Sequence, residues 1–123
     1  VDTKGDFAQL ASRIEDTVSS KADAIVLVSA DPTQVATQLQ SAFDAGIPVF
    51  GCDSGFVDGM VVNATSDNAA MGEMITKYLF DDLMGGKGTV IALTHRPHPG
   101  VAKRCTAFDE IIKEYPDIKL ITE

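Results

Sequence analysis

Short apolar runs alternate with amphipathic segments along the chain, and this alternation constrains the fold more than any other feature. Five apolar runs have the length of β-strands, at residues 24–28, 47–52, 60–64, 89–93 and 118–122. Most are apolar throughout, which is typical of strands that are buried on both faces of a sheet. Strands separated by helices favour parallel pairing with right-handed crossovers. We therefore predict an α/β protein with doubly wound parallel sheets in three αβα layers.

Capping signals mark the helices of the first half. Asp6 and Asp31 each precede a Gln by three residues, the spacing of a capping box. Pro32 suits the first helical position, and Gly46 suits a helix end. The apolar residues that recur at helical intervals, and that we expect to face inward, are Phe7, Leu10, Ile14 and Val18 in the first helix and Val35, Leu39, Ala42 and Phe43 in the second.

The second half predicts two further helices. Residues 66–68, Ser-Asp-Asn, offer caps for a long helix, and Pro116 ends the helix that follows the run at 89–93. Helical spacing predicts the following buried sides: Met71, Met74, Ile75, Tyr78, Leu79 and Leu83 on the first, and Val101, Cys105, Phe108, Ile111, Ile112 and Tyr115 on the second.

Composition excludes several classes of protein. The 123 residues carry a formal net charge of -8 without a basic run, which argues against a nucleic-acid or anionic-membrane surface. No apolar run approaches the length that spans a bilayer. The two cysteines, Cys52 and Cys105, make no disulfide framework, and we expect both to be small buried apolar groups. The chain opens at Val1, which suggests a mature, trimmed or partial chain.

The segment Asp53-Ser54-Gly55 is the first candidate for a site. It follows the apolar run 47–52 directly, and ligands of parallel sheets bind beyond the carboxyl ends of the strands. The same three residue types are also common in turns. From the residues alone, both a ligand group and a plain turn remain open.

Signals for catalysis, a cofactor or a metal are weak. No Gly-x-Ser-x-Gly elbow or Cys-His signature is present, and we expect no enzyme and no cofactor. Residues 85–88, Gly-Gly-Lys-Gly, follow a predicted helix and open a strand, the reverse of a phosphate loop. His95 and His98 lie in one loop that borders a strand end, but two histidines alone are a poor metal site. We expect no metal.

Four motifs together carry a resemblance. They are Ser-Ala-Asp-Pro at 29–32, Ala-Gly-Ile-Pro-Val-Phe-Gly-Cys-Asp-Ser at 45–54, Val-Val-Asn-Ala-Thr-Ser-Asp-Asn at 61–68, and Arg104 four residues before Phe108. In this order the chain resembles the type I periplasmic sugar-binding proteins of ABC importers, the ribose-binding-like family. That family shares its fold with the ligand domains of LacI-type repressors.

The resemblance implies portions of two lobes. Residues 1–66 would belong to the N-terminal lobe, without its first strand and helix, and residues 67–123 would begin the C-terminal lobe. In the family the two lobes close on a sugar by a hinge motion. Sheet edges left open in a partial chain also suggest a homodimer.

The resemblance also implies ligand residues. Asp53 matches the family's sugar-binding Asp, and Arg104 matches an Arg of the second lobe, although a solvated helix residue is an equal alternative for Arg104. Ser54 and Ser29 stand where ribose binders carry Arg and Asn. Apart from the resemblance, the loop at 94–100 lies at a strand end, and His98 is the preferred of its two histidines for a ligand contact; exposed histidines that have no role remain the favoured alternative.

The implied function is the binding of a monosaccharide or polyol in the periplasm for an ABC transporter permease. The alternative is the effector-binding domain of a LacI-type regulator. A secretion leader or a helix-turn-helix upstream would distinguish the two.

Overall fold

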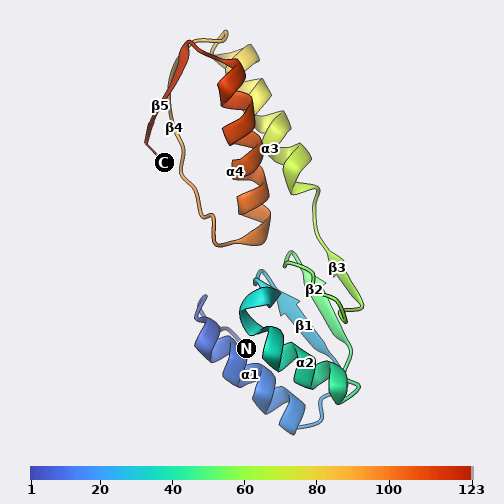
Figure 1. Cartoon of the computed structure of the whole chain (residues 1–123). Coiled ribbons are helices and arrows are strands. Elements are labelled where there is room, and N and C mark those ends of the chain that lie inside the picture. The colour runs from blue at the N-terminus through green and yellow to red at the C-terminus, as the bar shows by residue number, and fades with distance from the viewer. Residues whose placement is uncertain (123) are drawn as a thin grey trace. The chain divides into compact units, whose positions relative to one another are not determined.

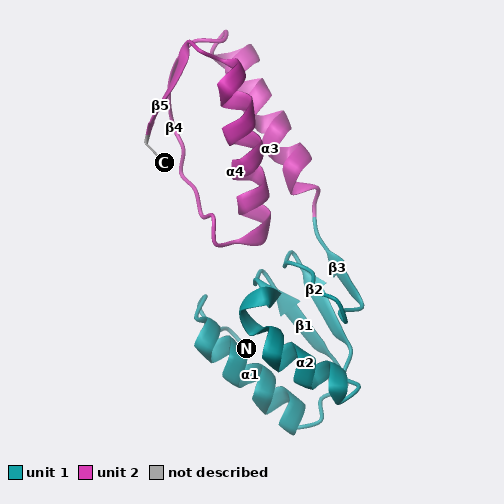
Figure 2. Cartoon of the chain, viewed as in Figure 1, with its two compact units in different colours: residues 1–65 teal, residues 66–123 magenta. Residues whose placement is uncertain are grey.

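The computed structural model describes residues 1–122, which form two compact units. Unit 1 comprises Val1–Thr65 and unit 2 comprises Ser66–Glu123 (Figure 2). The division falls one residue before the lobe boundary that the resemblance implies. Each unit has its own parallel sheet and its own hydrophobic core. The predicted parallel α/β architecture is therefore confirmed. Within residues 1–122, no helix combines the length and the hydropathy needed to cross a membrane.

Unit 1 consists of a three-stranded sheet and two helices. The helices are α1 (Phe7–Ser19) and α2 (Ala36–Asp44), and the strands are β1 (Ile25–Val28), β2 (Val49–Cys52) and β3 (Val62–Ala64). The strands pair in the order β1-β2-β3, all parallel, and α1 lies beside α2 (Figure 1). The core between helices and sheet contains the buried residues Ile14, Ile25, Val35, Leu39, Ala42, Ile47, Val49 and Met60.

The predicted helix signals of unit 1 are confirmed. The Asp6 side chain accepts hydrogen bonds from two backbone N–H groups of the first turn of α1. Asp31 accepts one from the backbone of Thr33 at the start of a 3₁₀ turn, Pro32–Val35, that leads into α2. Gly46 follows α2 with φ +73°, a conformation that glycine adopts at little cost.

One face of this sheet is uncovered in the described residues, contrary to the expectation of strands buried on both faces. Ile25 and Leu27 are buried, whereas Val26 and Val28 are 62% and 61% exposed. Alternate residues of a strand point to opposite faces, and α1 and α2 contribute to the core on one face only. The same alternation exposes Cys52, so the prediction that Cys52 is buried is wrong.

Unit 2 contains the helices α3 and α4 and the strands β4 and β5. Helix α3 (Asn68–Lys77) continues as a π-helical turn, Tyr78–Leu83, and α4 (Pro99–Ile111) follows β4 (Gly88–Ile91). Strand β5 (Ile118–Thr122) pairs with β4 in parallel, and α3 packs along α4 (Figure 1). The core contains the buried residues Phe80, Val90, Ile111 and Ile118.

Helix α3 does not bury the side that its sequence predicts. Met74 is 70% exposed, and Ile75, Tyr78 and Leu83 are exposed as well. The buried positions of the helix are instead Asn68, Gly72 and Thr76, with Phe80 in the turn that follows. The reason lies at Gly72, where an added Cβ would stand 2.7 Å from both Cα and the carbonyl oxygen of Arg104.

Helix α4 follows its prediction, with Cys105 and Ile111 buried. The outer face of its sheet is open within the described residues, since Ile91 and Ile121 are exposed. Neither unit therefore shows the third layer within the part of the chain that the structure describes. The predicted parallel strand pairing and the crossover helices are both present. The difference from the prediction is that each sheet packs a hydrophobic core on one face only in the described residues.

Candidate functional site

Two candidate residues lie side by side at the carboxyl edge of the unit 1 sheet. Ser29 follows β1 and Asp53 follows β2, and the last residues of these strands, Val28 and Cys52, are paired. The backbone of Ser29 donates to the Cys52 carbonyl over 3.0 Å, and that of Asp53 donates to the Ala64 carbonyl over 2.8 Å. The sheet pairing thus continues one residue beyond each strand and holds both residues in place.

Ser29 and Asp53 share an unusual backbone conformation. Both have φ of 50°, in the left-handed region that residues with a Cβ seldom occupy. Such strain persists where the surrounding hydrogen bonds over-determine it, and it concentrates at binding sites. The conformation turns the chain sharply at the strand end, where a parallel sheet presents its ligand groups.

Asp53 as a whole residue is half-buried, and its carboxylate makes a side-chain contact with Thr65. The Thr65 hydroxyl donates to Asp53 Oδ1 over 2.9 Å, from the residue that follows β3. A carboxylate offers about four acceptor positions on its two oxygens, so this bond uses part of its capacity. An ionised acceptor at a sheet edge is suited to pairs of ligand hydroxyls.

Ser54 has a different environment from Asp53. It is 6% exposed, its hydroxyl donates to the Gly55 carbonyl over 2.8 Å, and its carbonyl accepts from Asn63 Nδ2 over 2.7 Å. An added Cβ at Gly51 would lie 2.6 Å from the Ser54 hydroxyl oxygen. The position of the Ser54 side chain therefore requires glycine at residue 51. The structure thus gives Ser54 a part in holding the loop, and its contact with a ligand stays a prediction.

Arg104 in unit 2 is fixed by a buried amide. Its Nε donates to Asn68 Oδ1 over 2.7 Å, and Asn68 Nδ2 donates to the Ser66 carbonyl over 3.1 Å. Asn68 is only 3% exposed and packs against Gly100. Sequence reasoning treated Asn68 as a helix cap and missed this contact, because the partners are 36 residues apart.

A cavity of about 510 Å³ borders Arg104 within unit 2. Its lining comes from α3, from α4 and from the segment that follows β4, and it includes Leu93, His95 and Phe108. It lies at the carboxyl end of β4, where the sequence analysis expected the loop of histidines to border a site. Of the two histidines it is His95, and not the preferred His98, that lines the cavity.

His98 caps α4. Its Nδ1 accepts hydrogen bonds from the backbone N–H groups of Gly100, over 3.1 Å, and Val101, over 3.4 Å. A ring nitrogen that accepts must carry no proton, so the cap requires the neutral ring. The same loop is tied to α4 by Arg96, whose two terminal nitrogens lie 2.9 and 3.1 Å from the two carboxylate oxygens of Asp109. A ligand contact from His98 stays a prediction.

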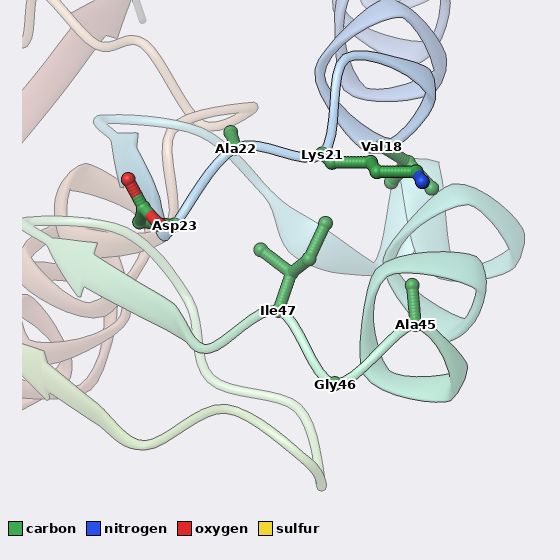
Figure 3. A pocket seen from close by; sticks show the side chains of 7 residues that line it. All are labelled: Val18, Lys21, Ala22, Asp23, Ala45, Gly46 and Ile47. Atoms are coloured by element: carbon green, nitrogen blue, oxygen red, sulfur yellow. The ribbon is translucent and has the colours of Figure 1, made fainter.

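A second pocket of about 470 Å³ lies at the opposite, amino end of the unit 1 strands, between the segments that precede β1 and β2 (Figure 3). Figure 3 shows the Lys21 side chain running past Val18 and away from Asp23. Its charged groups therefore do not converge on one point, and we place no site here. Within residues 1–122, no three His, Cys, Asp or Glu side chains gather in a way that would hold a metal ion.

Unit 1 thus has a parallel α/β sheet with the polar residues Ser29 and Asp53 directly beyond the ends of β1 and β2. A family model described as a periplasmic binding protein domain matches residues 1–123, so the chain belongs to the periplasmic binding protein family. Curated relatives of the chain include sugar import-binding proteins, which are transport components and not enzymes.

Named relatives agree with this class. The chain is 34% identical to the D-apiose import binding protein of Actinobacillus succinogenes, over 89% of this chain and 36% of that protein. Its structure is similar to the 5-methylthioribose transporter solute-binding protein of Thermotoga lettingae, with a TM-score of 0.88 and 27% identity over 96% of this chain and 37% of that one. A solute-binding protein of Agrobacterium vitis with bound allitol gives a TM-score of 0.81 and 31% identity over 98% and 41%. The chain thus spans well under half the length of these relatives.

Proposed function

We propose that the complete protein carrying these residues is the substrate-binding component of an ABC importer for a monosaccharide or polyol. The observation that carries the proposal is the family match over the whole chain, together with relatives whose descriptions name D-apiose, 5-methylthioribose and bound allitol. These relatives are import-binding proteins, which favours a transporter over the alternative of a LacI-type effector domain.

Asp53, Ser29 and Arg104 are the ligand groups that we propose. Asp53 accepts hydrogen bonds from neighbouring hydroxyls of the ligand, and Ser29, from the adjacent strand end, adds a hydroxyl that both donates and accepts. The Arg104 guanidinium donates in a fixed plane that suits two oxygens at once.

The partners and location follow from the same proposal. The protein acts outside the cytoplasm, in the periplasm, and delivers its ligand to a membrane permease. A homodimer through the open sheet edges stays a prediction of the sequence analysis. Sedimentation velocity that finds only a monomer would contradict it.

A thermal-shift screen of sugars, polyols and non-sugar solutes on the complete protein tests the proposal. A ligand that binds only the folded state raises the melting temperature as its concentration exceeds its Kd. We expect a dose-dependent rise with a small sugar or polyol, and D-apiose and allitol are the first compounds to try. A response to amino acids or to nucleosides alone, with none to sugars and polyols, would contradict the proposal.

A further inference from the structure

The two charged groups proposed to contact the ligand are each held by a neighbour from one short segment. Thr65 holds Asp53 in unit 1, and Asn68 holds Arg104 in unit 2. Thr65 directly follows β3, and Asn68, three residues later in the sequence, is the first residue of α3. We infer that Thr65 and Asn68 are positioning residues, which orient the Asp53 carboxylate and the Arg104 guanidinium for the ligand. This inference rests on the proposed function.

The contact at Thr65 is suited to orienting a group. Thr65 follows β3, which is paired with β2, so its backbone is tied to the sheet that carries Asp53. A β-branched side chain has few χ1 rotamers, and its hydroxyl therefore points in a defined direction. The bond of 2.9 Å to Oδ1 opposes rotation of the carboxylate about its terminal torsion, which is otherwise broad. Thr65 is exposed, so its hydroxyl contributes to orientation more than to packing.

The contact at Asn68 is determined chemically. Arginine Nε–H can only donate, so the amide must present its oxygen to Arg104 and its nitrogen to the Ser66 carbonyl, as the distances of 2.7 and 3.1 Å show. Gly100 packs against this amide so closely that a Cβ added at Gly100 would lie 3.0 Å from Asn68 Nδ2. The bond uses the donor nearest the side-chain stem. The terminal nitrogens carry the other four N–H groups in one fixed plane. Arg104 is also one of the residues that line the cavity of unit 2.

A purely structural role is the competing explanation, and the two roles differ in what they predict. Burial of Asn68 alone would affect stability, whereas positioning affects the order of Arg104 and the affinity for a ligand. Conservative variants separate the two. Asn68→Asp retains an oxygen for Arg104, and Thr65→Ser retains the hydroxyl for Asp53.

The first test needs no ligand. In the complete protein, ¹⁵N-labelled at arginine, the Arg104 Nε–H resonance is assigned by its loss in Arg104→Lys. We expect its exchange with water to be at least about tenfold faster in Asn68→Ala and close to wild type in Asn68→Asp, since only the former loses the acceptor. An unchanged exchange rate in a folded Asn68→Ala variant would overturn the role of Asn68.

The second test concerns Thr65. We expect Thr65→Val to bind D-apiose or allitol about fivefold more weakly and Thr65→Ser to bind within about twofold of wild type, as for one hydrogen bond. Thr89→Val, at an exposed strand position, is the matched control and leaves affinity unchanged. In an Asp53→Ala background we expect Thr65→Val to weaken binding much less, because the carboxylate that the Thr65 hydroxyl contacts is absent. Wild-type affinity of Thr65→Val would overturn the inference.

Failure of the inference and failure of the proposed function are distinguishable. If Asp53→Ala weakens sugar binding but Thr65→Val does not, the function stands and the positioning role falls. If the wild type binds neither probe, the function fails for these sugars. A crystal structure of Thr65→Val then tests whether Thr65 orients the Asp53 carboxylate. An Asp53 side chain in the same conformation as in the wild type would also overturn the role of Thr65.

Discussion

Unit 1 and unit 2 hold their candidate ligand groups in different ways. In unit 1, Asp53 lies on a strained backbone that the sheet hydrogen bonds keep in place, and the helices bury aliphatic stripes. In unit 2, Arg104 lies on a helix that meets α3 at Gly72, and a buried amide orients it. A hydrophobic stripe is a good guide where a helix covers a sheet. It is a poor guide where two helices meet through glycine and small polar residues.

The largest expected effect follows from the close helix contact of unit 2. Gly72→Ala places a methyl group 2.7 Å from backbone atoms of Arg104, which cannot turn aside as a side chain can. We expect a loss of about 2–3 kcal/mol in the free energy of unfolding, measured by urea denaturation. Ala70→Ser also adds one heavy atom, at an exposed position of α3, and should cost less than about 0.5 kcal/mol. Equal stability of the two variants would refute the glycine contact.

The corresponding glycine of unit 1 should be more tolerant. An added methyl at Gly51 meets the side chains of Ser54 and Asn63, which have more freedom to shift than backbone. We expect Gly51→Ala to cost about 1–2 kcal/mol in the same measurement and to weaken sugar binding, because the loop carrying Asp53 moves with Ser54. A larger loss than for Gly72→Ala would reverse the comparison between the units.

The helix starts provide a smaller test. Asp6 and Asp31 cap helices of unit 1, whereas His98 caps α4 of unit 2 through Nδ1. We expect His98→Ala to lower the free energy of unfolding by about 1 kcal/mol and His98→Asn to restore most of it, since Asn is a good N-cap. If His98→Ala instead abolishes sugar binding without a change in stability, His98 is a ligand residue, as the sequence analysis supposed.

The smallest effects distinguish the units by pH. Hydrogen bonding, chiefly from the backbone of Gln9, lowers the pKa of Asp6. The ionised Asp6 side chain therefore stabilises the folded state above the ordinary pKa of 3.8, and this stabilisation is lost as pH falls through the lowered pKa. The hydrogen bond to Asp81 raises the pKa of Tyr115. The protonated Tyr115 side chain therefore stabilises the folded state below the ordinary pKa of 10.0, and this stabilisation is lost as pH rises through the raised pKa.

Thermal melts across pH measure both contributions. Asp6→Asn should flatten the acid side of the stability profile, and Tyr115→Phe should flatten the alkaline side. If the slope of stability against pH is unchanged in both variants, the pH-dependent roles given to Asp6 and Tyr115 are wrong.

The sequence predicted the alternation of strands and helices, the aspartate caps and the position of Asp53, because each depends on neighbouring residues. It did not predict the buried side of α3, since no local pattern reveals that Gly72 lies against Arg104. It also assigned both faces of β1 to the core, because apolar composition alone does not show that Val26 and Val28 are exposed in the described residues. The bonds of Thr65 and Asn68 likewise join residues distant in sequence and required the structure.

Isothermal titration of the complete protein with a sugar or polyol from the thermal-shift screen tests the central claim most directly. The variants are Asp53→Ala and Arg104→Ala, with Asp58→Ala at an exposed position as the control. Because hydrogen bonds to charged groups are the stronger ones, we expect each of the first two variants to bind roughly 10- to 100-fold more weakly and the control to bind as wild type. Wild-type affinity in both Asp53→Ala and Arg104→Ala would contradict the account.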